Sequence, residues 1–190
     1  MKHWIEDSIE RMYIHVRFRI TRGAAVCHIY HCLDEYPENV SAGGVITRIP
    51  DGLGFRFYWA TAGLKVEDYR FCPENGAKSI GGLIGHVWGL SNWMCLNIFG
   101  EEEVRPKGIG EQRDHALQLI KKSRDFFCGL DEKELMDLQI EDWPFWHFIN
   151  GPISDALTHV GQINSFRRMA GNPPIKANVF LGQPPEGKSN

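Results

Sequence analysis

The chain contains no run of about 18 consecutive apolar residues, which is the length that a membrane-spanning helix needs. Its first residues lead into the charged side chains of Glu6, Asp7 and Glu10 rather than into an apolar segment, so we expect no secretory signal. Internal repeats and low-complexity segments are also missing. The sequence therefore predicts a protein without a membrane span, and we expect to find it in the cytoplasm.

A strong excess of positive charge is absent too. The 21 Lys and Arg residues are balanced by 24 Asp and Glu residues, which leaves a net charge of -3. Proteins that bind nucleic acid through its phosphates carry a basic surface, because neutralising the phosphates supplies most of the affinity. We therefore expect no nucleic-acid partner.

Cysteine is sparse, with 5 residues scattered through a chain of 190. A domain of this size folds without disulfides, so reduced thiols in a cytoplasmic protein are the simplest interpretation. Cys27, His28, His31 and Cys32 lie close enough together to suggest a zinc site. On a helix, however, they would fall on two different faces, and no second half of a zinc motif occurs elsewhere. We favour a structural role for this cluster.

Apolar side chains are plentiful, at 43% of the residues, and 12% of the residues are aromatic. They recur at the helical period in four long segments. These segments are residues 41–63, 79–99, 110–128 and 152–170. In the first of them Val45, Ile49, Leu53 and Phe57 are spaced four apart, which predicts one buried side, although Pro50 weakens the pattern.

The segment from Leu130 to Gly151 is too long for a tight hairpin. Its length predicts a crossover that runs along the bundle before the last helix. It holds an acidic helical turn at 131–137 and the aromatic run 143–148. We favour this run as an anchor of the crossover, and the alternative is that it walls a substrate pocket into which His147 reaches.

Together these features predict an all-α four-helix bundle with a long crossover before the last helix. We assign the bundle to residues 41–182, an irregular N-terminal extension to 1–40 and a flexible tail to 183–190. Within the extension, residues 13–20 alternate as a strand does, whereas 24–33 could form a helix. Residues 179–181 are apolar, and we expect them to dock on the bundle.

Asp155 and His159 are four residues apart in the last helical segment, so they share one face with Gln162. A carboxylate and an imidazole at this spacing can bind one ion, or they can form an ordinary solvated pair, which the spacing alone favours. His86 is surrounded by small and apolar residues, where a histidine is more often a half-buried core residue than a ligand.

Longer motifs carry a resemblance to a known family. Residues 79–87, with the sequence SIGGLIGHV, resemble the second-helix motif of the DinB/YfiT-like metal-binding four-helix-bundle superfamily. Residues 155–163, with the sequence DALTHVGQI, look like its last helix, together with FRR at 166–168 and GNP at 171–173. Residues 52–61 are similar to the first helix of an uncharacterised branch. The resemblance covers roughly residues 41–182.

The resemblance implies one divalent ion, nickel or zinc, held by a histidine of the second helix and two residues of the last. By position these ligands are His86, Asp155 and His159, and Asp155 stands where the superfamily usually has a histidine. The resemblance further implies a metal-dependent enzyme, either a thiol S-transferase or a hydrolase. Its partner would be a small-molecule substrate, including a low-molecular-weight thiol, and the bundle could pair into a homodimer.

The candidate substrate-binding residues are Gln162, Arg167, Arg168 and Trp59. The two arginines could bind a carboxylate of the thiol, or they could simply be cations placed favourably at the end of a helix. The alternative to an enzyme is a non-catalytic binding or structural bundle with a degenerate metal site, and the Asp155 position favours that alternative.

Overall fold

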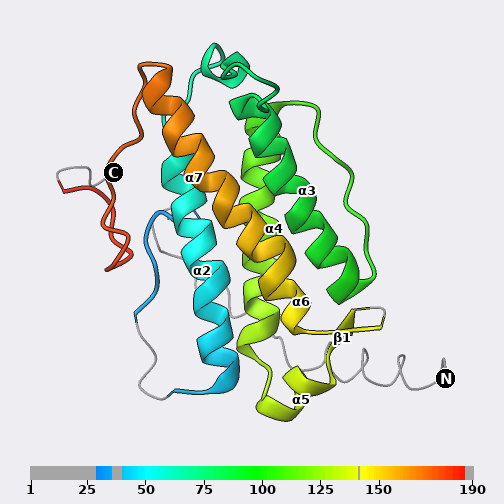
Figure 1. Cartoon of the computed structure of the whole chain (residues 1–190). Helices are drawn as coiled ribbons and strands as arrows, with labels where there is room; N and C mark the ends of the chain where they lie inside the picture. The colour runs from blue at the N-terminus through cyan, green and yellow to red at the C-terminus, as the bar shows by residue number, and fades with distance from the viewer. Residues whose placement is uncertain (1–28, 36–39, 141, 187–190) are drawn as a thin grey trace, which may run out of the picture.

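The computed structural model describes residues 29–35, 40–140 and 142–186. Most of them are helical, which confirms the prediction of an all-α protein (Figure 1). The long helices are α2 (Ala42–Thr61), α3 (Ile80–Phe99), α4 (Ile109–Cys128) and α7 (Ser154–Met169). The shorter elements are η1 (Asp68–Arg70), α5 (Glu132–Asp137), β1 (Gln139–Ile140), β2 (Trp143–Pro144), α6 (Trp146–Phe148) and the π-helix η2 (Ile149–Ile153).

Local signals place the helix ends within about two residues of the predicted segments. Ser41 and Ser79 cap α2 and α3, since each hydroxyl accepts a hydrogen bond from the backbone N–H three residues later, at 3.0 and 3.1 Å. Gly100 ends α3 in the left-handed conformation, with φ of 72°. The sequence of α3 therefore carries both its start and its stop signal, and that of α2 carries its start signal.

Each long helix packs against two others: α2 and α3 both contact α4 and α7. Side-chain contacts give the directions. Thr61 at the end of α2 accepts a hydrogen bond from Arg113 near the start of α4, so α2 and α4 are antiparallel. Cys95, late in α3, contacts Leu119 and Ser123, in the second half of α4, so α3 and α4 are parallel.

A parallel α3–α4 pair requires the chain to return along the whole bundle between them, and residues 100–108 do so (Figure 1). Nine extended residues reach ~30 Å, which equals the ~30 Å rise of a 20-residue helix. The longer segment between α4 and α7 instead stays at one end of the bundle (Figure 1). The predicted crossover before the last helix was therefore wrong in its position, because the length of a segment does not determine its path.

The buried stripe of α3 agrees with the sequence pattern, with Leu83, Ile84 and Val87 inside the core. In α2 the four-residue spacing was misleading, because Val45 is 52% exposed while Leu53 and Phe57 are fully buried. Each step of four residues turns the side chain by about 40° beyond a full turn. Val45 and Phe57 consequently lie on different sides of the helix.

Residues 29–35 pack on the bundle rather than away from it. Tyr30 is buried beside Gly54, and Leu33 N–H donates to the carbonyl of Gly182 at 2.8 Å. The predicted docking of 179–181 was wrong, since Phe180 is 89% exposed, and the tail is instead held through this backbone contact. The predicted strand at 13–20 and the first half of the possible helix at 24–33 lie outside the described residues. The second half, 29–33, forms turns and bends rather than a helix.

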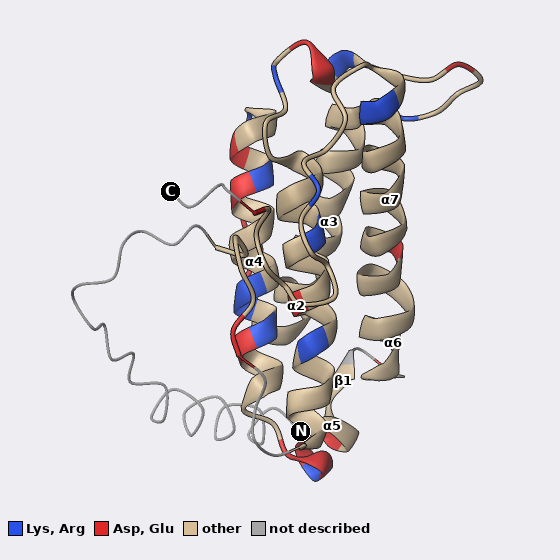
Figure 2. Cartoon of the chain, turned by 90° about the vertical axis from the view of Figure 1, so that its left-hand side faces the viewer, with Lys and Arg blue, Asp and Glu red and all other residues tan. Residues whose placement is uncertain are grey.

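Charge is distributed unevenly over the bundle. Lys, Arg, Asp and Glu follow one another along α4, whereas α3 carries none of them (Figure 2). In the ranges that the structure describes, no helix combines the length and the apolar character that crossing a bilayer requires.

Candidate metal centre

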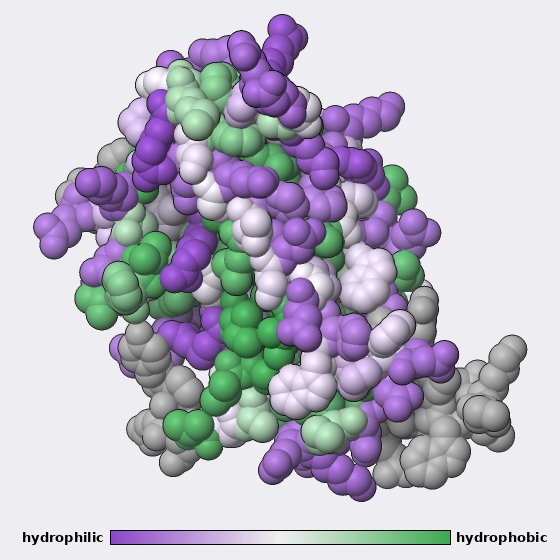
Figure 3. Space-filling view, in the orientation of Figure 1, coloured by the Kyte–Doolittle hydropathy of each residue, from purple (hydrophilic) through white to green (hydrophobic). Residues whose placement is uncertain are grey.

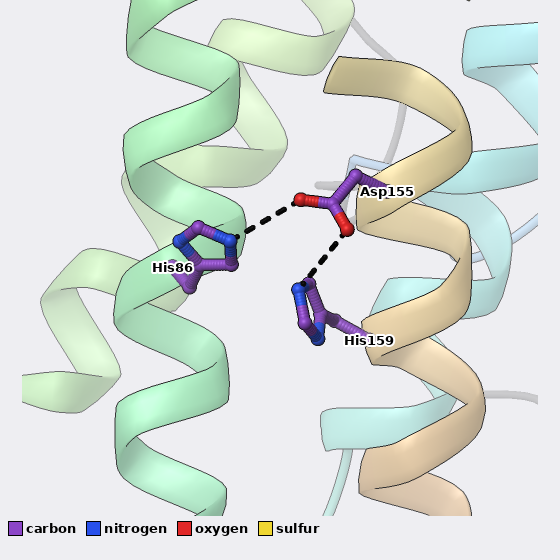
Figure 4. A group of neighbouring side chains, drawn as sticks. All are labelled: His86, Asp155 and His159. Atoms are coloured by element: carbon purple, nitrogen blue, oxygen red, sulfur yellow. Dashed lines mark hydrogen bonds and ion pairs between the residues drawn. The ribbon is translucent and has the colours of Figure 1, made fainter. Parts of the chain in front are cut away.

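His86 of α3 and the pair Asp155 and His159 of α7 point toward one another between the two helices (Figure 4). His86 Nε2 lies 3.2 Å from Asp155 Oδ2, and His159 Nε2 lies 3.3 Å from Asp155 Oδ1. The imidazole rings are 4.6 Å apart between centroids, with their planes at 75°. One potential ligand atom from each residue lies within 4.8 Å of the other two. The structure thus brings the three predicted ligands together.

The helices explain this convergence. Asp155 and His159 are one turn apart on α7 and project from the same face. The space opposite them is open, since a Cβ added to Gly89, close to one turn beyond His86 on α3, would meet no atom within 4 Å. The cluster is therefore accessible: the His86 and Asp155 side chains are 36% and 46% exposed, while His159 is 13% exposed.

Gln162 fixes the orientation of the His159 ring. Its Oε1 lies 2.8 Å from His159 Nδ1. In the tautomer that carries its hydrogen on Nδ1, the ring donates to this oxygen, and Nε2 presents a lone pair toward Asp155. That lone pair and the Asp155 oxygen would repel each other. A metal ion between the two groups would accept this lone pair and remove the repulsion, so the geometry is compatible with a cation at this point.

The donor set fits a divalent metal ion. Donor atoms bound to one tetrahedral zinc at 2.0–2.1 Å are ~3.3 Å apart. Here the two histidines lie 3.2 and 3.3 Å from different oxygens of Asp155, and the three donor atoms lie within 4.8 Å of one another. Two imidazoles and a carboxylate suit nickel and zinc, and three protein ligands leave positions open for water or substrate.

The other predicted substrate residues lie in different surroundings. Arg167 is buried and holds α7 to α2, because its guanidinium donates to the carbonyls of Ala60 and Ala62, both at 2.8 Å. Burial lowers the pKa of Arg167, and the charge of Asp68 offsets part of this effect. Trp59 is also buried, and its indole N–H donates to the carbonyl of His31. Both side chains hold the fold together, so we assign them no role in substrate binding.

Arg168 differs from Arg167 because its side chain is exposed. Its guanidinium donates to the carbonyl of Asn164, one turn back on α7, at 2.7 Å. It lies beyond Gln162 along the helix, so of the four predicted substrate residues only Gln162 directly contacts a residue of the cluster.

An open groove of about 640 Å³ adjoins the cluster and shares Asp155 with it. Leu90 and Trp93 of α3 form one side, and Trp143 and His147 form another. Within the aromatic run 143–148, Phe145 and Phe148 are buried, as expected of an anchor, while Trp143 and His147 line this groove.

Sequence reasoning missed the α3 side of the groove. The available signal was spacing, since Trp93 follows His86 by two turns and shares its face of α3.

The cluster at 27–32 is only partly described. Cys27 and His28 lie outside the described residues, and the ring of His31 packs against Tyr58 and Trp59, at centroid distances of 5.8 and 5.1 Å. His31 therefore has a packing role on α2.

No protein-family model matches the sequence, and no curated protein or solved structure matches it either. The resemblance to the DinB/YfiT-like superfamily remains a prediction, and the function must be argued from the geometry of the cluster.

Proposed function

We propose that this protein is a metal-dependent enzyme of the DinB/YfiT-like kind, whose centre is the cluster of His86, Asp155 and His159. The observation that carries the proposal is the arrangement around His159. Gln162 occupies its Nδ1, its Nε2 faces a carboxylate oxygen at 3.3 Å, and His86 adds a third donor from the opposite helix. Three donor atoms within 4.8 Å of one another, two imidazole nitrogens and a carboxylate oxygen, support a divalent metal site.

The chemistry follows from the open side of this site. A nickel or zinc ion there would lower the pKa of a bound water or thiol and supply a nucleophile near neutral pH. Asp155 and the two histidines would hold the ion, and Gln162 would keep the lone pair of His159 aimed at it. The groove beside Asp155 gives a small-molecule substrate a place to lie against the open side. These roles suit either a hydrolase or a thiol S-transferase. We propose a cytoplasmic location, where scattered cysteines stay reduced.

Titration of untagged, chelator-treated protein with Co²⁺ tests the proposal, because the visible absorption of this ion reports its ligands. We expect one equivalent to bind with an intense spectrum. His86→Ala and His159→Ala should lose this spectrum. His115→Asn is the matched control, since His115 lies on α4 and an Asn side chain can still accept the hydrogen bond of Trp88 Nε1. An identical spectrum in all four proteins would sink the proposal.

A second step separates the two reaction classes. Adding 2-mercaptoethanol to the Co²⁺-loaded protein should produce a sulfur-to-metal absorption band in the near ultraviolet if a thiol is the co-substrate. If water is the nucleophile, the band stays absent and 4-nitrophenyl acetate is hydrolysed with the same metal dependence.

A non-catalytic bundle is the second candidate, because the carboxylate can pair with two protonated histidines without any metal. A working site gains stability from its ion by mass action, about 2.7 kcal/mol at a hundredfold excess over Kd. If saturating zinc and nickel leave the melting temperature unchanged, the degenerate-site alternative is favoured.

A further inference from the structure

We infer that the groove beside the cluster binds the uncharged aromatic part of a small-molecule substrate. The inference rests on the proposed function, because it places the reactive end of that substrate at Asp155. It goes further in naming the substrate class, which the three metal ligands alone do not define.

The groove and the cluster form one continuous site. His86 and Trp93 project from one face of α3, two turns apart. Gly151 of η2 precedes Asp155, near the start of α7, by about one turn. The seam between the two helices therefore leads from the histidines directly into the groove. Its volume of about 640 Å³ is within the range of small-molecule sites.

The walls select for aromatic rings. Trp93 and Trp143 both line the groove, and the ring of His147 contacts Trp143 at 4.6 Å between centroids, with the planes tilted by 49°. Trp93 is supported by Phe148 behind it, at 6.1 Å, so this wall is preformed. Figure 3 shows apolar atoms and pale aromatic rings gathered over the lower half of this side of the molecule. A planar ligand would gain ring contacts there without reorganising the protein.

The charge of the groove selects against anions. Among the described residues that line it, Asp155 is the one Asp, Glu, Lys or Arg, and α3 contributes no charge at all. A carboxylate on the ligand would find no Lys or Arg side chain in the lining of the groove and would lie next to the Asp155 carboxylate. The ligand that fits is therefore an uncharged aromatic compound with a polar group at one end.

Gly151 provides a way to block the groove alone. It lines the groove, a Cβ added to it would meet no atom within 4 Å, and its φ is not positive, so a larger side chain can be accommodated. Gly161 is the matched control, since it is exposed on α7, also faces open space and does not line the groove.

The experiment measures binding of indole and of indole-3-acetate to metal-free protein by calorimetry or by ligand-observed NMR. We expect indole to bind the unchanged protein and Gly161→Leu equally, and Gly151→Leu to bind it at least roughly tenfold more weakly. Indole-3-acetate should bind less tightly than indole. Equal binding of indole to all three proteins, or stronger binding of the acetate, would overturn the inference.

Co²⁺ binding by the same three proteins separates this inference from the proposed function. If all three proteins bind Co²⁺ with the same spectrum and Gly151→Leu still binds indole normally, the inference about the groove is refuted and the proposed metal centre is not. If none of the three proteins binds Co²⁺ but Gly151→Leu loses indole binding, the inference about the groove is supported and the proposed metal centre is refuted.

Discussion

Gln162 illustrates how a single side chain prepares the candidate centre. It contacts His159 on the nitrogen that faces away from Asp155, and so determines which nitrogen is available to an ion. Partners of this kind typically change metal affinity by 10–100-fold when removed. Gln162 is thus a positioning residue rather than a ligand.

We therefore expect Gln162→Ala to weaken zinc binding by roughly 10–100-fold, measured by competition with a chromophoric chelator. Gln162→Glu should restore the affinity, because its carboxylate accepts the same hydrogen bond. If Gln162→Ala binds zinc as tightly as the unchanged protein, the hydrogen bond has no role in orienting His159.

The neighbouring arginines provide a second contrast at this scale. Arg167→Ala removes the donors of buried carbonyls at the ends of two helices, so we expect a loss of about 2–4 kcal/mol in the free energy of unfolding. Arg168→Ala should cost less than about 0.5 kcal/mol, since its side chain is exposed. Urea denaturation measures both. Comparable losses would contradict the roles assigned to them.

At the scale of the elements, residues 100–108 are the most constrained connection. They run the length of the bundle with almost no slack, and are tied down where Glu103 N–H donates to Asn92 Oδ1 and where Gln112 Nε2 donates to the carbonyl of Pro106. This segment, rather than the link before α7, sets α3 and α4 parallel.

Removing Glu101 and Glu102 would shorten the reach of the crossover by ~7 Å. We expect this deletion to unwind a helix end and to cost several kcal/mol in the free energy of unfolding. Inserting two glycines at the same place should cost less than about 1 kcal/mol, because loop entropy grows slowly with length. Denaturant titration distinguishes them, and a harmless deletion would show that the segment has slack.

The helices and their connections also show which parts of the fold could be predicted from the sequence. The long helices were predictable because period and caps are local, as Ser79 and Gly100 show for α3. The path of 100–108 was not predictable, because it depends on the parallel packing of α3 and α4. The convergence of His86 with Asp155 depends in the same way on α3 packing against α7, and only the resemblance to a family indicated it. The groove is lined by two stretches of the chain that lie far apart in the sequence, residues 90–93 and 143–155, so no single motif indicated it.

At the scale of the whole molecule, one buried network joins η1, α2 and α7. Asp68 Oδ2 accepts hydrogen bonds from Lys65 N–H and from Asn172 Nδ2, both at 2.7 Å, and Asn172 in turn contacts Arg167. The backbone hydrogen bond from Lys65, followed by that from Asn172, lowers the pKa of Asp68 below its ordinary value despite burial.

A carboxyl group whose pKa is lowered by folding stabilises the protein above its ordinary pKa of about 3.9, and this contribution is lost as the pH falls through the folded pKa. We expect the free energy of unfolding to decrease below pH ~4 more steeply in the unchanged protein than in Asp68→Asn. The pKa of Asp51 is shifted the other way, because burial raises it against the lowering effect of Arg124. Asp51 is present in both proteins, so its contribution to the pH dependence cancels when the two profiles are compared. Parallel acid profiles would contradict the assignment.

The central claim is that two helices hold one divalent ion between His86, Asp155 and His159. Elemental analysis of untagged protein, purified without added metal, tests it most directly. The account predicts close to one nickel or zinc ion per chain, its loss in His86→Ala and His159→Ala, and its retention in His115→Asn. Equal metal content in all four proteins, or none in any of them, would contradict it.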